Sequence, residues 1–454
     1  MGRLFGTDGI RGVANTELTP ELAFAVGRAG ATVLAHSSER HRPVIVGRDT
    51  RISGSMLEAA IVAGITSVGR DVLSVGIVPT PAVAAIVVRT GAAAGVMISA
   101  SHNPIADNGI KFFGADGFKL SDSLEDEIES LVDAPDVPRP SGTGIGVAGI
   151  AQNLGKHYYD LLYEDAADLS GLTVVVDAAY GAAYAIAPYA LRKLGARVIE
   201  MHCENDGTRI NVDCGATHLE PLRQRVRESI EQGQPAVGAA FDGDADRAMF
   251  VDETGQALNG DHVMMLLARD MHARGTLRNG AVVATVMSNI GLEKALQSSG
   301  IALLRAPVGD RYVLERMREG GYVLGGEQSG HIINLLRNTT GDGPMTAISV
   351  FSTMVRSGRS LHELTADLVT YPQVLVNVKT AYKDVLEDSA VQAAVRDAEL
   401  NLTGNGRLLI RPSGTEPLIR VMVEGDDRHR IERIAKTLAE RIGQASTALE
   451  AARR

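Results

Sequence analysis

Short hydrophobic runs alternate with amphipathic stretches along the first part of the chain. Strand-like runs lie at residues 43–49, 71–78 and 93–99, and helix-like stretches separate them at 54–68 and 81–88. Strands that alternate with helices in this way are typical of a mostly parallel sheet with helices on its faces. The segment 133–144 is rich in proline, glycine and serine, which favours a linker at the edge of this domain.

The same alternation restarts after the linker. Strand-like runs follow at 172–179, 196–201, 236–242, 247–253, 280–288, 301–307 and 322–331, with helices expected from about 182 and at 221–231. After Tyr371-Pro372 the pattern changes. Runs at 374–379, 406–414 and 417–425, a helix near 389–400 and a long closing helix indicate antiparallel pairing in a smaller α+β domain.

We therefore predict an α/β protein with three similar domains, built on mixed or parallel sheets, and a smaller C-terminal α+β domain. The expected boundaries are 1–150, 151–254, 255–369 and 370–454. A chain of 454 residues is too long for one ordinary core, so several domains are expected on length alone. No internal repeat is visible at the level of sequence.

Composition and charge argue against several classes of function and location. The formal net charge of −10 and the lack of a basic stripe argue against a nucleic-acid partner. No secretory signal opens the chain, and prolines interrupt the longest uncharged stretches, so we expect a cytoplasmic protein without a membrane span. Cys203 and Cys214 are too few for a disulfide framework and are expected to be reduced thiols.

Three polar clusters each follow a strand-like run, one in each α/β domain. They are "SASHNP" from residue 99, "DGDADR" from residue 242 and "GEQSGH" from residue 326. Ligands of open α/β sheets bind beyond the carboxyl ends of the strands. We therefore expect the three clusters to meet in one central cleft.

The second cluster places Asp242, Asp244 and Asp246 two residues apart. Carboxylates this close repel one another unless a cation lies among them, and hard oxygen ligands suit Mg²⁺ or Ca²⁺. An EF-hand loop is rejected because Arg247 stands where that loop needs glycine. A solvated acidic loop is the alternative. Three carboxylates underfill a Mg²⁺ shell, so a further oxygen is expected from elsewhere, for example a phosphate.

Two glycine-containing loops carry arginine and suit an anion. "RPSGTEPLIR" offers Arg411, Ser413, Gly414 and Thr415, with Arg420 after a short strand, although a plain hairpin turn would also explain it. "GTDGIRG" carries Arg11, and a glycine-rich N-terminus without function is equally compatible. "GIGVAG" from residue 144 matches the dinucleotide-binding pattern, but it follows a linker where that motif needs a strand.

Ser101 and the "GEQSGH" cluster leave alternatives open. Ser101 is a nucleophile, a helix cap or only part of a loop, and Pro104 and Asn108-Gly109 favour a loop over a capped helix. His102 is poorly placed as its base, because neighbouring side chains diverge on an extended chain. Glu327, Ser329 and His331 alternate, so on a strand they would point together at sugar hydroxyls; a structural histidine is the alternative.

Four of these motifs together resemble those of the α-D-phosphohexomutase superfamily, in the same order and one per domain. They are "SASHNP", "DGDADR", "GEQSGH" and "RPSGTEP". "FGTDGIRG", "ISASHNP" and Gln328 resemble its bacterial phosphoglucosamine mutase branch. The resemblance implies conversion between glucosamine 6-phosphate and glucosamine 1-phosphate, on the route to UDP-N-acetylglucosamine and cell wall. It also implies four domains around a central cleft, one Mg²⁺ per chain and glucosamine 1,6-bisphosphate as intermediate and activator. "DGDAD" departs from the "DGDGD" of many relatives at Ala245 only.

The resemblance also assigns roles to residues. Ser101 would be the phosphoserine, and its phosphate would share the metal with Asp242, Asp244 and Asp246. Apart from the resemblance, Lys111 and Arg247 are our candidates for further charge neutralisation, and Lys111 and His331 for proton transfer; we expect the pKa of Lys111 to be lowered by flanking cations. The expected substrate contacts are Arg11, His102, Glu327, Ser329, Arg411, Ser413, Gly414, Thr415 and Arg420.

Three rival functions stay open. A sister mutase would prefer mannose or glucose phosphates, a metal-dependent phosphatase would release inorganic phosphate, and a sugar-phosphate sensor would not turn over. The partner is expected to be a small phosphosugar, with neither nucleic acid nor membrane, and a homodimer is compatible with the sequence.

Overall fold

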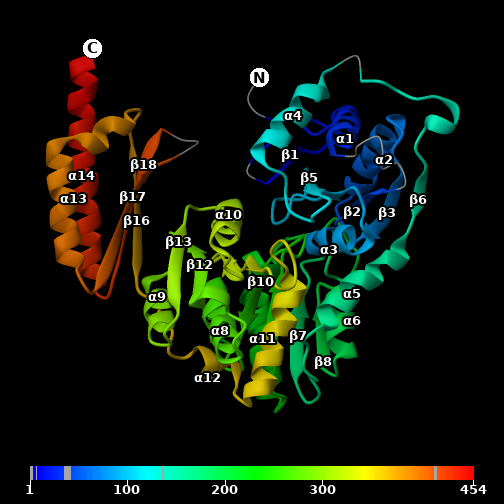
Figure 1. Cartoon of the computed structure of the whole chain (residues 1–454). Coiled ribbons are helices and arrows are strands. Elements are labelled where there is room, and N and C mark those ends of the chain that lie inside the picture. Colours follow the sequence, from blue (N-terminus) through cyan, green and yellow to red (C-terminus); the bar gives the residue numbers. More distant parts are fainter. Residues whose placement is uncertain (1–3, 7, 35–41, 135–136, 414–416, 454) are drawn as a thin grey trace. The chain divides into compact units, whose positions relative to one another are not determined.

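The computed structural model describes residues 4–6, 8–34, 42–134, 137–413 and 417–453. They form two compact units. The first unit takes in the chain up to residue 285 and residues 304–366, and the second takes in residues 286–303 and 367–454. Each unit is described by itself below (Figure 1).

The first sheet of unit 1 has six strands in the order β1-β5-β4-β2-β3-β6. β2, β3, β4 and β6 run parallel, whereas β5 runs antiparallel to both β4 and β1. The strands are β1 (Ile10–Val13), β2 (Val44–Arg48), β3 (Val72–Ile77), β4 (Ala94–Ile98), β5 (Asp107–Gly114) and β6 (Ala148–Ile150), and the helices are α1 (Pro20–Leu34), α2 (Gly54–Ser67), α3 (Thr80–Thr90) and α4 (Asp122–Val132).

Helices cover both faces of this sheet. Val46 and Val96 belong to a buried cluster with residues of α1, α2 and α4. The alternate positions Gly47 and Gly95 lie against Val83 of α3, where a Cβ on either glycine would approach within 3 Å. Alternating burial on both faces explains the continuous apolar runs of β2 and β4.

The second sheet has the order β11-β10-β9-β7-β8. Its strands are β7 (Thr173–Asp177), β8 (Arg197–Met201), β9 (Val237–Phe241), β10 (Ala248–Val251) and β11 (Ala257–Leu258), and the neighbouring helices are α5 (Lys156–Tyr163), α6 (Ile186–Lys193) and α7 (Glu220–Glu231). β10 pairs antiparallel with β9. The run 247–253 therefore belongs to the second sheet, because a turn at Asp242 and Ala245 brings the chain back alongside β9.

The third sheet has the order β13-β12-β14-β15. Its strands are β12 (Ala281–Thr285), β13 (Ala302–Ala306), β14 (Leu324–Gly326) and β15 (Ile332–Asn334), and the helices along this part of unit 1 are α8 (Gly260–Ala273), α10 (Asp310–Gly320), α11 (Gly343–Ser357) and α12 (Leu361–Thr365). β14 runs parallel to β12 and antiparallel to β15. The hairpin between β14 and β15 carries the "GEQSGH" cluster.

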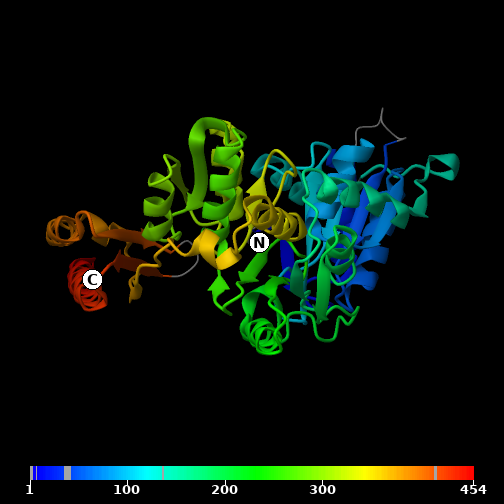
Figure 2. The same ribbon diagram turned by 90° about the horizontal axis from the view of Figure 1, so that it is seen from below.

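Unit 2 is a three-stranded antiparallel sheet, β16-β18-β17, with two helices packed on it. Figures 1 and 2 show these helices together on the same side of the sheet. The elements are α9 (Ile290–Gln297), β16 (Gln373–Lys379), α13 (Ser389–Leu402), β17 (Gly406–Pro412), β18 (Leu418–Gly425) and α14 (Arg428–Arg453). The antiparallel α+β pattern expected after Pro372 is confirmed.

A buried ion pair joins the two chain segments of unit 2. Arg407 binds Glu424, which is fully buried, and also donates to the carbonyls of Val286 and Ser288 at 2.7 and 3.0 Å. Residues 286–303 are thereby tied to the C-terminal sheet. Among the described helices, none combines the length and apolar character needed to cross a bilayer.

Candidate functional site

Ser101 lies in a tight turn directly after β4. Its backbone is in the left-handed region, with φ of 53°, and its side chain is buried. Its hydroxyl donates to Asp242 Oδ2 at 2.6 Å, and its amide donates to Ser99 Oγ at 2.9 Å. The next regular element is β5, so Ser101 does not cap a helix. A strained backbone that aims a hydroxyl at a buried carboxylate is typical of a functional site.

Arg51 holds this turn in shape. Its guanidinium donates to four backbone carbonyls at 2.5–2.9 Å, namely those of Ser101, Asn103, Pro104 and Asp107. Arg51 is fully buried and forms an ion pair with Asp49 at 3.0 Å. The planar fork of arginine suits several fixed acceptors, which a lysine could not serve in the same way.

Asp242, Asp244 and Asp246 converge in the turn after β9. One oxygen from each lies within 4.8 Å of the others, and all three side chains are buried. Burial, with the nearby charges of Asp246 and Asp244, raises the pKa of Asp242 to about 8. Asp244 Oδ1 and Asp246 Oδ1 are buried and have no hydrogen-bond partner. Unsatisfied buried carboxylate oxygens fit a hard divalent cation.

Lys111, on β5, lies against the aspartates. Its Nζ is 2.9 Å from Asp244 Oδ2 and 2.9 Å from Asp8 Oδ2. Burial favours the neutral amine, but the carboxylates of Asp244, Asp8 and Asp246 outweigh it and raise the pKa of Lys111. The expected lowering of this pKa is therefore wrong, because Lys111 is surrounded mainly by carboxylates rather than by cations.

A cleft of about 480 Å³ opens beside these groups within unit 1. Three residues expected to bind substrate line it, Arg11, His102 and Glu327, together with Arg247 and His331. Arg11 donates to Asn103 at 3.0 Å. Burial and the charges of Arg247 and Arg11 lower the pKa of His102. The cleft thus combines cations suited to a phosphate with hydrogen-bonding groups suited to a sugar.

The "GEQSGH" cluster forms a tight turn. The amide of Glu327 donates to the carbonyl of His331, and the amide of Gly330 donates to that of Glu327. The expectation of a strand with Glu327, Ser329 and His331 on one face is therefore wrong. Ser329 Oγ nevertheless donates to Glu327 Oε2 at 3.3 Å. Gln328 turns elsewhere and donates to Asp261 at 3.2 Å.

His331 is buried between two carboxylates. Its Nδ1 lies 3.5 Å from Asp246 Oδ2 and its Nε2 lies 3.6 Å from Asp310 Oδ2. Burial alone would lower the pKa of His331, but Asp246 and Asp310 outweigh it and raise the pKa. The histidine is thereby linked to the aspartate cluster.

The arginines expected to grip phosphate lie in unit 2. Arg411 on β17 and Arg420 on β18 are paired across the ladder, so their charges lie close together. Burial and the charge of Arg420 lower the pKa of Arg411. Ser413 is buried at the end of β17, and its amide donates to the carbonyl of Leu418. Gly414 and Thr415 lie outside the described residues.

The whole chain is similar to known protein families and solved structures. Four models described as phosphoglucomutase/phosphomannomutase domains I, II, III and C-terminal match residues 2–138, 156–255, 259–371 and 375–441. The chain belongs to the phosphoglucomutase/phosphomannomutase family. It is 55% identical over 448 residues to a "Phosphoglucosamine mutase" of Thermoanaerobacter sp. (strain X514), covering 97% of this chain and 99% of that one.

Solved structures of this family agree. A phosphoglucomutase/phosphomannomutase family protein from Burkholderia thailandensis is 25% identical, with a TM-score of 0.81 and coverage of 98% of this chain and 97% of that one. An N-acetylphosphoglucosamine mutase of Aspergillus fumigatus, solved with GlcNAc-6P and magnesium, is 18% identical, with a TM-score of 0.66 and coverage of 98% and 96%. The predicted fold class and the resemblance to phosphohexomutases are confirmed.

Several side chains of this phosphohexomutase site were not expected from the sequence. Asp8 binds Lys111 and Lys119, and Thr80 Oγ1 donates to Asp244 Oδ2 at 2.6 Å. Asn211 Nδ2 donates to the carbonyl of Ser101 at 2.9 Å. Thr80 begins α3, Asn211 lies in a loop, and Asp8 lies in the "GTDGIRG" loop, from which only Arg11 was singled out. Only the fold brings them to the aspartates and to Ser101.

Proposed function

We propose that this enzyme interconverts glucosamine 6-phosphate and glucosamine 1-phosphate through a phosphorylated Ser101 and a bound 1,6-bisphosphate. The observation that carries the proposal is the contact of 2.6 Å between Ser101 Oγ and Asp242 Oδ2. The name of the Thermoanaerobacter relative supports the choice of an amino sugar. The product would supply UDP-N-acetylglucosamine and cell-wall synthesis.

In the proposed reaction, the phosphoryl group of Ser101 passes to the free hydroxyl of the bound monophosphate. The P–O bond to Ser101 Oγ breaks, a P–O bond to the sugar forms, and the hydroxyl proton goes to a base. The bisphosphate then rotates end for end without leaving the site. Its other phosphoryl group passes to Ser101 Oγ, and the sugar oxygen that it leaves takes up a proton. Because little covalent chemistry falls to the protein, positioning and charge neutralisation supply most of the catalysis.

Asp242, Asp244 and Asp246 would hold one Mg²⁺ together with an oxygen of the Ser101 phosphate. The ion supplies charge neutralisation of the transferring group when bound. The two unpartnered oxygens on Asp244 and Asp246 support this ligand set. Magnesium is also present in the Aspergillus structure, which lends support at the level of the fold.

Arg247 and Lys111 would neutralise further charge, since both lie beside the aspartates. Because the pKa of Lys111 is raised, His331 is the candidate that we retain for proton transfer. Arg11, His102, Glu327 and Ser329 would bind the sugar phosphate in the cleft. Arg411, Ser413, Gly414, Thr415 and Arg420 would bind the phosphate that is not being transferred. We also propose a cytoplasmic location, which cell fractionation would test, and a homodimer, which sedimentation would test.

The test combines intact mass with turnover. Purified protein is expected to carry the mass of one phosphoryl group, and Ser101→Ala is expected to lose both that mass and all turnover. Ser123→Ala, at an exposed position on α4, is the matched control and should keep both. Normal turnover in Ser101→Ala would overturn the mechanism.

The substrate is tested separately. The amino sugar phosphate is expected to give a higher kcat/KM than mannose 6-phosphate or glucose 6-phosphate. A preference for either 2-hydroxy sugar would replace the proposal with a sister mutase. Steady release of inorganic phosphate would indicate a phosphatase instead.

A further inference from the structure

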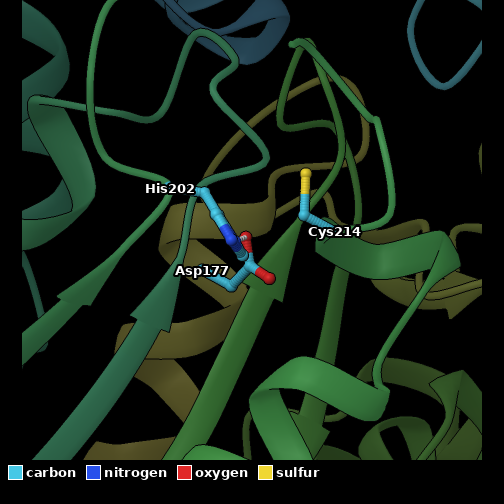
Figure 3. A group of neighbouring side chains, drawn as sticks. All are labelled: Asp177, His202 and Cys214. Carbon is cyan, nitrogen blue, oxygen red and sulfur yellow. Dashed lines mark ion pairs between the residues drawn. The ribbon is translucent and has the colours of Figure 1, made fainter.

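A second cluster of potential metal ligands lies away from the three aspartates. Asp177 ends β7, His202 follows β8, and Cys214 lies in the loop that continues from it. Figure 3 shows the imidazole of His202 meeting the carboxylate of Asp177, whereas the side chain of the neighbouring Cys214 is drawn with its sulfur directed away from them. One donor atom from each residue lies within 4.8 Å of the other two.

The carboxylate of Asp177 is fixed by the backbone around it. Its Oδ1 accepts from the amide of Ala179 and its Oδ2 accepts from the amide of Gly215, both at 2.9 Å. Gly215 is adjacent to Cys214, so the same carboxylate also sets the position of the cysteine. Outer hydrogen bonds of this kind orient ligands in metal sites.

The imidazole nitrogen that faces the cluster is paired with the carboxylate of Asp177, and this contact raises the pKa of His202. His202 Nδ1 lies 3.1 Å from Asp177 Oδ1, but it is buried and lacks a hydrogen-bond partner of good geometry. A separation of 3.1 Å is close to the roughly 3.3 Å between nitrogen and oxygen ligands of one tetrahedral ion, given metal–ligand bonds of about 2.0 Å. The nitrogen is therefore placed to bind a cation that the carboxylate shares.

We propose that Asp177, His202 and Cys214 form a second metal site, specific for a borderline divalent ion such as Zn²⁺. A sulfur, a nitrogen and an oxygen donor suit Zn²⁺ far better than Mg²⁺, which prefers oxygen alone. Three protein ligands leave the fourth position to water. The sulfur would turn toward the nitrogen on binding, because sulfur and nitrogen ligands of one Zn²⁺ lie roughly 3.5 Å apart.

Binding would release protons to solvent. The thiol proton of Cys214 leaves as the sulfur–metal bond forms, and His202 binds as neutral imidazole. Burial raises the pKa of the Cys214 thiol to about 12, so without a metal the thiol stays protonated and unreactive. A bound cation would reverse this preference.

The surroundings admit an ion. His202 is only partly buried, and the ring of Tyr180 packs on it with centroids 5.0 Å apart. Arg209 lies over the ring of Tyr180, 4.1 Å from its centroid, and Asp206 binds the guanidinium at 2.6 Å. The local positive charge is thereby partly offset.

The site is connected to Ser101 by two hydrogen bonds. Ala179, which donates its amide to Asp177, accepts at its carbonyl from the amide of Asn211 at 3.0 Å. Asn211 Nδ2 in turn donates to the carbonyl of Ser101 at 2.9 Å. An ion that fixes Asp177 and Cys214 would therefore stabilise the support behind the Ser101 turn, and we expect the melting temperature to rise on binding.

Cobalt spectroscopy tests the proposal without relying on activity. Co²⁺ is added to the full-length protein in excess Mg²⁺, which competes at the all-oxygen aspartate site. We expect one equivalent of Co²⁺ to produce the near-ultraviolet charge-transfer band of a cobalt–thiolate bond, and Zn²⁺ to abolish it by displacement. The aspartates carry no sulfur and cannot give this band.

The two cysteines provide a matched pair of variants. Cys203 is adjacent to His202, but its thiol donates to the carbonyls of Val176 and Met201. Cys203→Ala should keep the band, whereas Cys214→Ala and His202→Gln should lose it together with the rise in melting temperature. The proposal is overturned if the wild-type protein shows no band, or if the band survives Cys214→Ala. Should Cys214→Ala fail to fold, a band that persists unchanged in His202→Gln overturns it instead.

Discussion

Lys119 Nζ lies 2.5 Å from Asp310 Oδ2 and so joins the first α/β domain of unit 1 to the start of α10. The same amine binds Asp8 at 2.6 Å. Asp8 contacts Lys111, and Asp310 contacts His331, so one partly buried cation orders two groups beside the aspartates. Lys119 therefore positions Lys111 and His331 indirectly, through the carboxylates of Asp8 and Asp310.

We predict that Lys119→Met lowers kcat about a hundredfold, because a displacement of about 1 Å in catalytic groups has this effect. It also removes one cation from each of two partly buried carboxylates, of which Asp8 keeps Lys111 and Asp310 keeps His331, so we expect a loss of only about 1 kcal/mol of stability. Steady-state kinetics and denaturant unfolding measure the two effects.

Arg311→Met is the matched control. Arg311 lies on α10 next to Asp310 and binds Asp122 of α4 at 2.7 Å. It contacts none of the aspartates that hold Lys111 or His331. If Arg311→Met lowers kcat as much as Lys119→Met does, the effect comes from domain docking and the positioning role of Lys119 is rejected.

The pKa of about 8 at Asp242 predicts that Mg²⁺ binding depends on pH. Below pH 8 this carboxyl holds a proton in the metal-free protein, and Mg²⁺ must displace it. Affinity should therefore rise as pH rises, about tenfold per unit below pH 8, and become constant above it. Calorimetry in two buffers of different ionisation enthalpy should show release of about one proton at pH 7 and almost none at pH 9. Binding without any buffer dependence at pH 7 would contradict this.

Arg51 is predicted to be indispensable although it lines no part of the cleft. Arg51→Lys keeps a positive charge but cannot serve four carbonyls, so the Ser101 turn would lose its fixed shape. We expect kcat to fall about a hundredfold or more, together with loss of the phosphoryl group from the intact mass. Arg48→Lys is the control, because Arg48 ends β2 three residues before Arg51 and binds Glu58; this variant should retain most activity.

The sequence was informative where local pattern and chemistry coincide. Apolar runs that end in Ser101 or Asp242 predicted both a strand and a site, because the residues at the end of a parallel strand reach the ligand edge of the sheet. Asp8, Arg51 and Lys119 were not predicted, since their roles depend on partners far away in the chain. The pKa of Lys111 was predicted with the wrong sign because the carboxylates of Asp244 and Asp8 reach its amine only in the folded chain.

The "GEQSGH" cluster was also misjudged locally. Its alternating polar residues suggested a strand, but Gly330 adopts a φ of 91°, which permits a tight turn. The turn keeps Glu327 in the cleft and sends Gln328 towards Asp261. A polar pattern of period two is ambiguous when a glycine interrupts it, and only tertiary packing decides.

The carboxylate of Glu327 leads to the last prediction, which concerns the choice of sugar. It lines the cleft, where it accepts from the amide of Gly309 at 3.2 Å and from Ser329 Oγ at 3.3 Å. The substituent at C2 of glucosamine 6-phosphate is an ammonium group, whereas that of glucose 6-phosphate is a hydroxyl. A hydrogen bond to a charged group contributes roughly 1.5–3 kcal/mol, so Glu327→Gln should lower kcat/KM for the amino sugar about ten- to hundredfold. The same variant should change kcat/KM for glucose 6-phosphate much less. Ser329→Ala, which removes a neutral hydroxyl, should lower both values by only about fivefold. Equal losses for the two sugars in Glu327→Gln would show that this carboxylate positions the turn and does not read the amino group.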